Sequence, residues 1–206
     1  TRLKGYAAVP LFQRYQPFAV RARQLLAEGR FGPVSHIYVR INRPAPARYP
    51  AWDSAWMLDP AEAGGGCLRN LGSHGLDMFL YLTGDDAQVT GAQISTRAHG
   101  QRVEEYASVL LRSATGILGT VEVGNGFPRV GTDGEWRLAG RDAKGHAHHA
   151  SRTGAHHRTQ LLVRQRRQAM LGAQGVGRAS QVRRTVDQGT VEVEQHGTNY
   201  ATHAGR

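Results

Sequence analysis

A histidine about a third of the way along the chain stands among polar residues at helical spacing. Intervals of four, three and four residues place four side chains along one face of a helix: Asn70, His74, Asp77 and Tyr81. Imidazole is the side chain whose ordinary pKa lies nearest neutrality, so His74 is chemically suited to proton transfer. Taken alone, however, a single helical histidine is more often a structural or surface residue than a catalyst.

The residues around His74 predict a helix that follows a glycine triplet at 64–66 and runs to about Leu82, with Gly84 as its stop. The other face of this helix is formed by six small or apolar residues: Leu68, Leu71, Gly75, Met78, Phe79 and Leu82. The preceding loop carries Trp52 and Trp56, for which packing is favoured over a role as sugar-binding platforms.

The segment from Trp56 to Gly84 resembles part of the second domain of the Gfo/Idh/MocA family of NAD(P)-dependent oxidoreductases. In that family a Trp-containing loop precedes three glycines and a helix of the pattern L-x-D-x-G-x-H-x-x-D. The matching residues here are Gly64, Gly65, Gly66, Leu68, Asn70, Gly72, His74 and Asp77. The neighbouring segments follow the family in the same order, so the resemblance covers about residues 7–143.

The resemblance implies a sugar, inositol or similar polyol as substrate and hydride transfer between the substrate carbon and a nicotinamide. The hydroxyl proton must move as well, which requires an acid or base with a pKa near the working pH. His74 occupies the position with this catalytic role in the family. The residues expected to bind substrate are Trp56, Asn70, His74 and Asp77.

The chain departs from the family at residue 70, where the usual aspartate is Asn70. An amide can form hydrogen bonds but cannot hold negative charge, so His74 lacks the anionic partner that would favour its protonated form. Weaker proton transfer, a changed substrate or loss of activity could follow. Asp77 is the nearest carboxylate, but a spacing of three residues turns it about 60° away from His74.

The remaining elements indicate an α+β fold with a mainly antiparallel open sheet and helices packed on one face. Pro17 suits the first turn of a helix that ends near Gly29. Alternating apolar residues around Val39 predict a strand. Further strands are expected at 88–97, 105–112, 117–124 and 135–139, with a hairpin turn at 114–116.

The residues that would bind a dinucleotide are missing. No Gly-x-Gly-x-x-Gly fingerprint precedes the segment that resembles the family. The family's Glu-Lys-Pro motif is missing as well, because Lys4 is followed by Gly5. We therefore expect the Rossmann nucleotide domain to be absent, and this chain alone to bind no cofactor and to be inactive. The cofactor of a full-length parent would be NAD or NADP.

Composition divides the chain into a domain at residues 1–143 and a basic segment at 144–206. Residues 1–140 carry 15 Lys+Arg and 12 Asp+Glu, whereas residues 141–206 carry 11 and 4 with seven of the ten histidines. The basic segment has few large apolar residues, so low fold content and disorder are expected. Out-of-frame translation of a GC-rich gene is the favoured explanation.

Two other readings of the basic segment stay open. Six arginines could contact the phosphates of a nucleic acid: Arg164, Arg166, Arg167, Arg178, Arg183 and Arg184. Five histidines could bind a metal adventitiously, although their spacing fits no ordered site: His146, His148, His149, His156 and His157. Nucleic acid is not the favoured partner, and no metal site is predicted.

The single cysteine, Cys67, excludes an intrachain disulfide and fits a small buried apolar residue. No apolar run is long enough to span a membrane, so a cytoplasmic protein is expected. Homo-oligomerisation through the open sheet face is the expected self-association. The alternative to an enzyme component is a non-catalytic sugar-binding or oligomerisation module.

Overall fold

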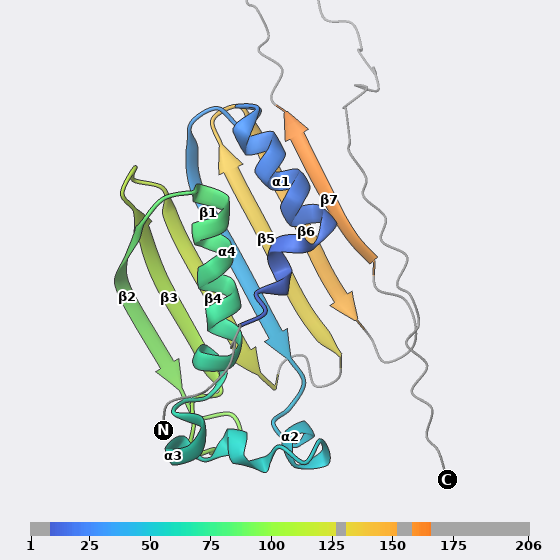
Figure 1. Ribbon diagram of the computed structural model, residues 1–206, viewed down its shortest axis with the longest axis vertical. Helices are drawn as coiled ribbons and strands as arrows, with labels where there is room; N and C mark the ends of the chain where they lie inside the picture. Colours follow the sequence, from blue (N-terminus) through green and yellow to red (C-terminus); the bar gives the residue numbers. More distant parts are fainter. Residues whose placement is uncertain (1–8, 127–130, 152–157, 166–206) are drawn as a thin grey trace, which may run out of the picture.

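The structure is a computed structural model that describes residues 9–126, 131–151 and 158–165. These residues form a seven-stranded sheet in the order β2-β3-β4-β1-β5-β6-β7 (Figure 1). Of the described strand pairs, only β1 and β4 run parallel, which confirms the mainly antiparallel open sheet. The bounds are β1 Val34–Arg43, β2 Ala87–Ser95, β3 Tyr106–Ser113, β4 Leu118–Asn125, β5 Thr132–Gly140, β6 Ala143–Ser151 and β7 Arg158–Gln165.

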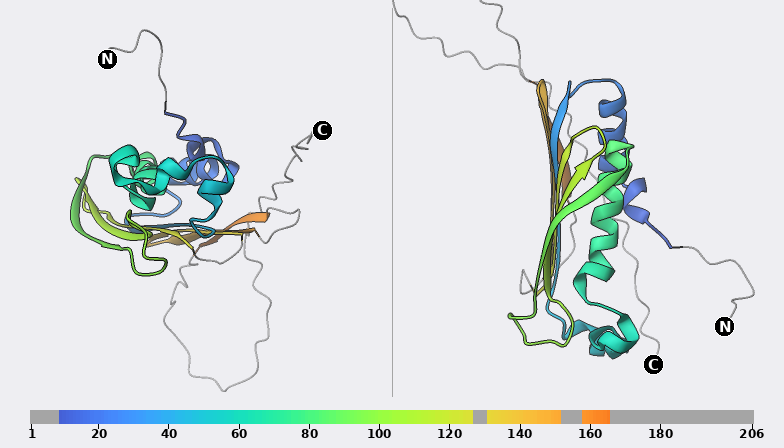
Figure 2. Two further views of the ribbon diagram at one scale, coloured as in Figure 1. Left: turned by 90° about the horizontal axis from the view of Figure 1, so that it is seen from below. Right: turned by 90° about the vertical axis from the view of Figure 1, so that its left-hand side faces the viewer.

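Two longer helices cover one face of the sheet, and no described helix covers the other face, which we call the bare face (Figure 2). Helix α1 spans Pro17–Ala27 and begins on its proline, as expected. Helix α4 spans Ser73–Thr83 and ends at Gly84, whose φ of 66° is the left-handed conformation that glycine adopts readily. The described helices include none that is long and apolar enough to cross a membrane.

Glycines bring α4 close to the central strands. A Cβ atom on Gly75 of α4 would lie 2.5 Å from a methyl carbon of Val121, and one on Gly119 of β4 would lie 2.5 Å from the ring of Phe79. Both distances are far below van der Waals contact, so the missing side chains are what allow this approach. Phe79, Val121 and the neighbouring Val39 are fully buried at this contact.

A chain of short elements connects β1 to α4: α2 at Arg48–Ala51, η2 at Ala55–Leu58, α3 at Pro60–Ala63 and the π-helical turn η3 at Leu68–Gly72. The glycine triplet lies between α3 and η3. A Cβ atom on Gly66 would lie 2.1 Å from the carbonyl oxygen of Glu104, which itself accepts a hydrogen bond from the Cys67 amide at 3.0 Å. The triplet therefore lets the loop rest against the segment before β3.

The four later strands and the hairpin turn are confirmed, but the sheet continues beyond the expected domain boundary at 143. Strand β6 was missed because its described inward residues, Ala143 and Gly145, are small, so no apolar alternation marks its start. The ring of Phe31 fills the space above one of them, Gly145, with a closest approach of 3.1 Å to the position of a Cβ atom. The predictions of disorder and of out-of-frame translation cover residues 144–206, of which 152–157 and 166–206 lie outside the described ranges.

Candidate active site

A cavity of about 380 Å³ lies where η3 and α4 meet the segment before α1. Three of the four expected substrate-binding residues line it: Trp56, Asn70 and His74. Residues that sequence reasoning did not select complete the wall: Val9, Pro10, Phe12, Met57, Glu62, Ala63, Gly65, Gly66, Arg69 and Ser73. Asn70 and His74, which their spacing placed on one helix face, both line this cavity, whereas Asp77 and Tyr81 of the same predicted face do not.

His74 is half-buried, and its Nδ1 atom is buried without a hydrogen-bond partner among the described residues. The ring of Phe12 packs edge-on against the imidazole, with ring centroids 5.3 Å apart and an interplanar angle of 62°. Burial lowers the pKa of His74, the positive charge of Arg43 lowers it further, and Asp77 opposes this shift. The imidazole is therefore neutral at pH 7 and able to accept a proton.

Asn70 is held by a buried tyrosine. Its Nδ2 atom donates a hydrogen bond of 3.1 Å to the hydroxyl of Tyr49, which is only 3% exposed and also accepts a 2.9 Å hydrogen bond from Arg48 Nη2. None of the described residues donates to the side-chain oxygen of Asn70. That oxygen is thus available to accept a hydrogen bond from a ligand hydroxyl.

Asp77 is the one predicted substrate ligand that the structure places elsewhere. Its side chain is buried, and its carboxylate accepts hydrogen bonds from Arg14 Nε at 2.8 and 3.0 Å and from Arg14 Nη2. Hydrogen bonding to Asp77 raises the pKa of Arg14. Because Arg14 belongs to η1, the short helix Phe12–Tyr15, this pair fixes the segment that carries Phe12.

The packing interpretation of the two loop tryptophans is wrong. Trp52 is 66% exposed and Trp56 is 54% exposed, so neither ring belongs to the core. Trp56 lies in η2 at the edge of the cavity, where an aromatic face can stack on a sugar ring. Trp52 has the guanidinium of Arg48 5.9 Å from the centre of its ring.

Arg43 is the functional candidate that sequence reasoning missed. Arg43 is the last residue of β1, and its positive charge lowers the pKa of His74. A signal was present in the sequence, since residues 37, 39 and 41 of β1 point into the core and position 43 continues that alternation with a charge. Phe12 left no comparable signal, because its contact with His74 depends on how η1 crosses α4.

Neither Cys67 nor the described histidines form a metal centre. Cys67 is fully buried, and burial raises the pKa of its thiol to about 12, as suits a small core residue. Within the ranges that the structure describes, no three His, Cys, Asp or Glu residues are placed to hold a metal ion. Of the five tail histidines considered as ligands, only His146 has a described side chain, and it lies 3.1 Å from Glu135.

The glycine triplet at 64–66 does not fit the phosphates of a dinucleotide. A glycine-rich phosphate loop leaves backbone amides free at the start of a helix. Here the amide of Leu68, just after the glycine triplet, already donates a 3.0 Å hydrogen bond to the carboxylate of Glu104. Gly66 in turn packs against the backbone of the same glutamate.

Several solved structures with a similar fold are of enzymes in complex with NAD or NADH. GenD2 from gentamicin A biosynthesis, in complex with NAD, has 26% identity and a TM-score of 0.58 over 66% of this chain and 37% of its own. Levoglucosan dehydrogenase, in complex with NADH and levoglucosan, has 18% identity and a TM-score of 0.65 over 91% of this chain and 46% of its own.

The WlbA dehydrogenase from Bordetella pertussis, in complex with NADH and UDP-GlcNAcA, has 22% identity and a TM-score of 0.54 over 66% of this chain and 40% of its own. The chain thus spans less than half the length of each of these three structures. No curated protein matches it in sequence. The GFO/IDH/MocA C-terminal domain model matches residues 19–144, so the chain belongs to the GFO/IDH/MocA family.

Proposed function

We propose that this domain forms the substrate side of an NAD(P)-dependent oxidoreductase that acts on a sugar, an inositol or a similar polyol. The observation that supports this most is the half-buried imidazole of His74, with a buried and unpartnered Nδ1, on the wall of a 380 Å³ cavity. Asn70 adds a hydrogen-bond acceptor to the same cavity, and Trp56 adds an aromatic face. This combination suits a ligand with several hydroxyl groups and an apolar ring face.

Oxidation of an alcohol removes a hydride from carbon and a proton from oxygen. Among the described residues, neutral His74 can accept the proton from a substrate hydroxyl. Phe12 excludes water from one side of the imidazole, and Asn70 can orient a neighbouring hydroxyl. The dinucleotide would bind outside the described residues, on a nucleotide-binding domain, so the described part alone would bind substrate without turning it over.

Binding of polyols by the chain itself tests this proposal most directly. Levoglucosan, glucose and myo-inositol should be titrated while the His74 ring protons are followed by NMR. We expect at least one of them to shift these resonances and the shift to saturate. Calorimetry measures the same titrations in variants that lack the ring: His74→Ala should weaken binding, whereas His36→Ala, at an exposed histidine of β1, should not. No response to any polyol would contradict the proposed function.

Catalysis is tested by joining the full chain to the nucleotide-binding domain of levoglucosan dehydrogenase and following NADH formation. The proposal expects turnover that His74→Ala abolishes. A specific observation favours a second candidate, a non-catalytic sugar-binding module: Asn70 stands where the family usually has aspartate. Saturable sugar binding with no NADH formation would support this second candidate.

We also propose that two copies associate through the bare face of the sheet (Figure 2). Large apolar side chains of β3 and β4 are exposed: Tyr106, Leu110 and Leu118, at 40%, 49% and 46%. Leu110 pairs with Thr120, and residues opposite one another share a face, so both side chains lie on the face away from the buried Val109 and Val121. Such a row is typical of a protein–protein contact.

A further inference from the structure

We propose that Arg43 binds an anionic group of the substrate, a carboxylate or a phosphate, in a small cavity beside His74. This inference rests on the proposed function, because it assigns the charge of the same substrate. The cavity has a volume of about 60 Å³, which accommodates one small polar group. Phe12 lines both this cavity and the larger one at His74, so the two spaces adjoin.

Arg43 carries a charge that the fold leaves unbalanced. Its side chain is half-buried, and among the described residues it forms no ion pair and no side-chain hydrogen bond. By contrast, Arg14 binds Asp77, and Arg40 lies 3.0 Å from Asp133 and 3.1 Å from Glu135. A buried cation without a partner is unfavourable, so Arg43 is a residue that an incoming anion would stabilise.

Arg48 is a second cation near Arg43 that has no acidic partner among the described residues. Arg48 is also half-buried, and its side-chain hydrogen bonds to described residues go to uncharged groups such as the Tyr49 hydroxyl and the Asn125 side-chain oxygen. Burial lowers the pKa of Arg43 and of Arg48, and for Arg48 the charge of Arg43 contributes to the shift. The end of β1 therefore has an excess of positive charge.

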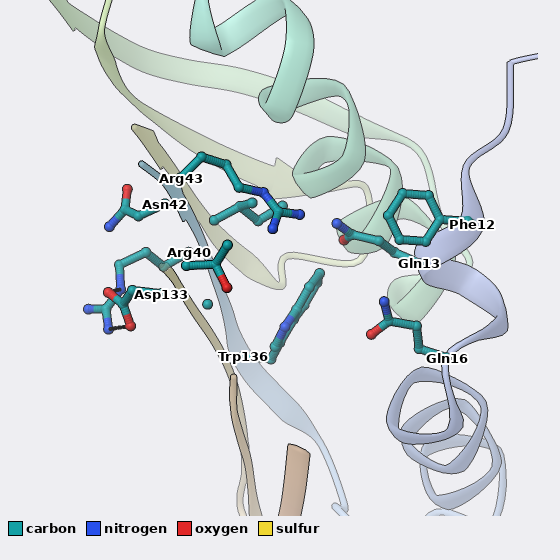
Figure 3. A pocket seen from close by; sticks show the side chains of 11 residues that line it. Phe12, Gln13, Gln16, Arg40, Asn42, Arg43, Asp133 and Trp136 are labelled. Atoms are coloured by element: carbon teal, nitrogen blue, oxygen red, sulfur yellow. Dashed lines mark hydrogen bonds and ion pairs between the residues drawn. The ribbon is translucent and has the colours of Figure 1, made fainter. Parts of the chain in front are cut away.

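Neutral groups in the cavity are also without partners. Gln13 is 5% exposed, and its Oε1 atom is buried with no hydrogen-bond partner among the described residues. The Oγ1 atom of Thr132 is likewise buried without such a partner. An amide can turn to present its NH2 group and a hydroxyl can donate, so both side chains can add hydrogen bonds to an anion held by Arg43. Figure 3 shows Arg43 and Gln13 facing one space with Trp136 below them.

One carboxylate also lines the cavity, and its position leaves Arg43 free to bind. Asp133 is engaged by Arg40, with a hydrogen bond of 3.2 Å besides the 3.0 Å ion pair. Figure 3 shows this pair on the side of the cavity away from Gln13, whereas Arg43 extends toward Gln13. Arginine is well suited to the role because its planar guanidinium can form two parallel hydrogen bonds to a carboxylate or phosphate.

The test compares charged and neutral ligands on the full chain, with the His74 ring resonances as the readout. Glucuronate and glucose 6-phosphate should bind about tenfold or more tightly than glucose, as expected for hydrogen bonds between charged groups. Both should raise the pKa of His74, because the anion neutralises the nearby Arg43 charge. Inorganic phosphate alone should raise it at higher concentration. Tighter binding of glucuronate than of glucose 6-phosphate would identify the anionic group as a carboxylate, and the reverse order would identify it as a phosphate.

Two variants assign the effect to Arg43. Arg43→Gln should remove the preference for charged sugars and the response to phosphate, while Arg97→Gln, at an exposed arginine, should keep both. Should Arg43→Gln fail to fold, Gln13→Glu serves instead, since its carboxylate would occupy Arg43 and compete with added anions. Equal affinity for glucose and glucuronate, or a preference that survives these variants, would overturn the inference. Failure of every sugar to bind while phosphate still acts would contradict the proposed function alone.

Discussion

Arg14 Nε lies 2.8 Å from Asp77 Oδ2, and this contact joins the segment before α1 to the middle of α4. The carboxylate is 8% exposed and the guanidinium 41% exposed, so the pair is covered on one side only. Phe12 lies two residues before Arg14 and packs on His74, one turn before Asp77. The pair therefore links the stability of the N-terminal segment to the surroundings of the candidate base.

Removal of the Arg14 guanidinium should show how much the Arg14–Asp77 pair contributes to stability. Arg14→Ala leaves the buried Asp77 carboxylate without its partner and should lower the free energy of unfolding by about 1–3 kcal/mol. Arg102→Ala breaks an ion pair with Asp59 whose side chains are 69% and 39% exposed, and should cost less than about 0.5 kcal/mol. Urea unfolding measures both. Equal losses would mean that the Arg14–Asp77 pair does not anchor the segment.

The contact between α4 and β4 gives a prediction about glycine. Gly119→Ala should destabilise the fold by about 1–3 kcal/mol, because the new methyl group would lie 2.5 Å from the Phe79 ring. Gly91→Ala is the matched control in β2, where the nearest atom would be 3.6 Å away, and should change stability by less than about 0.5 kcal/mol. Thermal unfolding of the two variants checks this. A tolerated alanine at 119 would mean that Phe79 can move aside.

The sequence predicted the features that depend on local periodicity. Pro17 and Gly84 correctly marked the start of α1 and the end of α4, because proline and left-handed glycine act on the backbone directly. The spacing of Asn70 and His74 predicted a shared helix face, and both side chains line one cavity. These predictions hold because each depends on residues within one or two turns of a helix.

Features set by distant contacts were not predictable in the same way. Strand β6 has Gly145 at an inward position, and the ring that covers it, Phe31, comes from a loop more than a hundred residues earlier. Asp77 matched the family motif as a substrate ligand, but its partner is Arg14, 63 residues away. Packing was favoured for the ring of Trp56, which was also among the expected substrate ligands, and the structure leaves it 54% exposed in η2 at the cavity.

The bare sheet face should control self-association. Leu110→Glu places a charge in the exposed apolar row of β3 and should shift the chain to smaller assemblies at a given concentration. Val89→Glu is the control: Val89 is 62% exposed but pairs with Leu111, so its side chain lies on the helix-bearing face of the sheet. Light scattering after size exclusion measures the mass. Identical masses for wild type and Leu110→Glu would argue against association through this face.

His74 should make stability depend on pH. Burial and Arg43 lower its pKa in the folded state, so the unfolded chain binds the proton more readily. The contribution of neutral His74 is fully present above about pH 6.5 and is lost as the pH falls through the lower pKa of the folded state. Urea unfolding should therefore show a steeper loss below pH 6.5 for wild type than for His74→Gln. Arg43→Gln should lie between them, and identical profiles for all three would contradict this account.

Asn70→Asp should restore an anionic partner to His74. The hydroxyl of Tyr49, 3.1 Å from Asn70 Nδ2, can donate to the new carboxylate, so the variant should fold without large loss of stability. The negative charge should raise the pKa of His74 by favouring the imidazolium, which an NMR titration measures directly. Asn70→Ala, which adds no charge, should leave that pKa nearer the wild-type value while weakening polyol binding.

The same variant separates the two candidate functions. In the chain joined to a nucleotide-binding domain, a carboxylate coupled to His74 should make the imidazole a stronger base and speed NADH formation, if wild type is active but limited by proton transfer. Activity that appears only in Asn70→Asp would instead mean that the amide makes this domain a binding module. An unchanged His74 pKa in Asn70→Asp would show that the two side chains are not coupled, and then residue 70 would act through hydrogen bonds to the ligand alone.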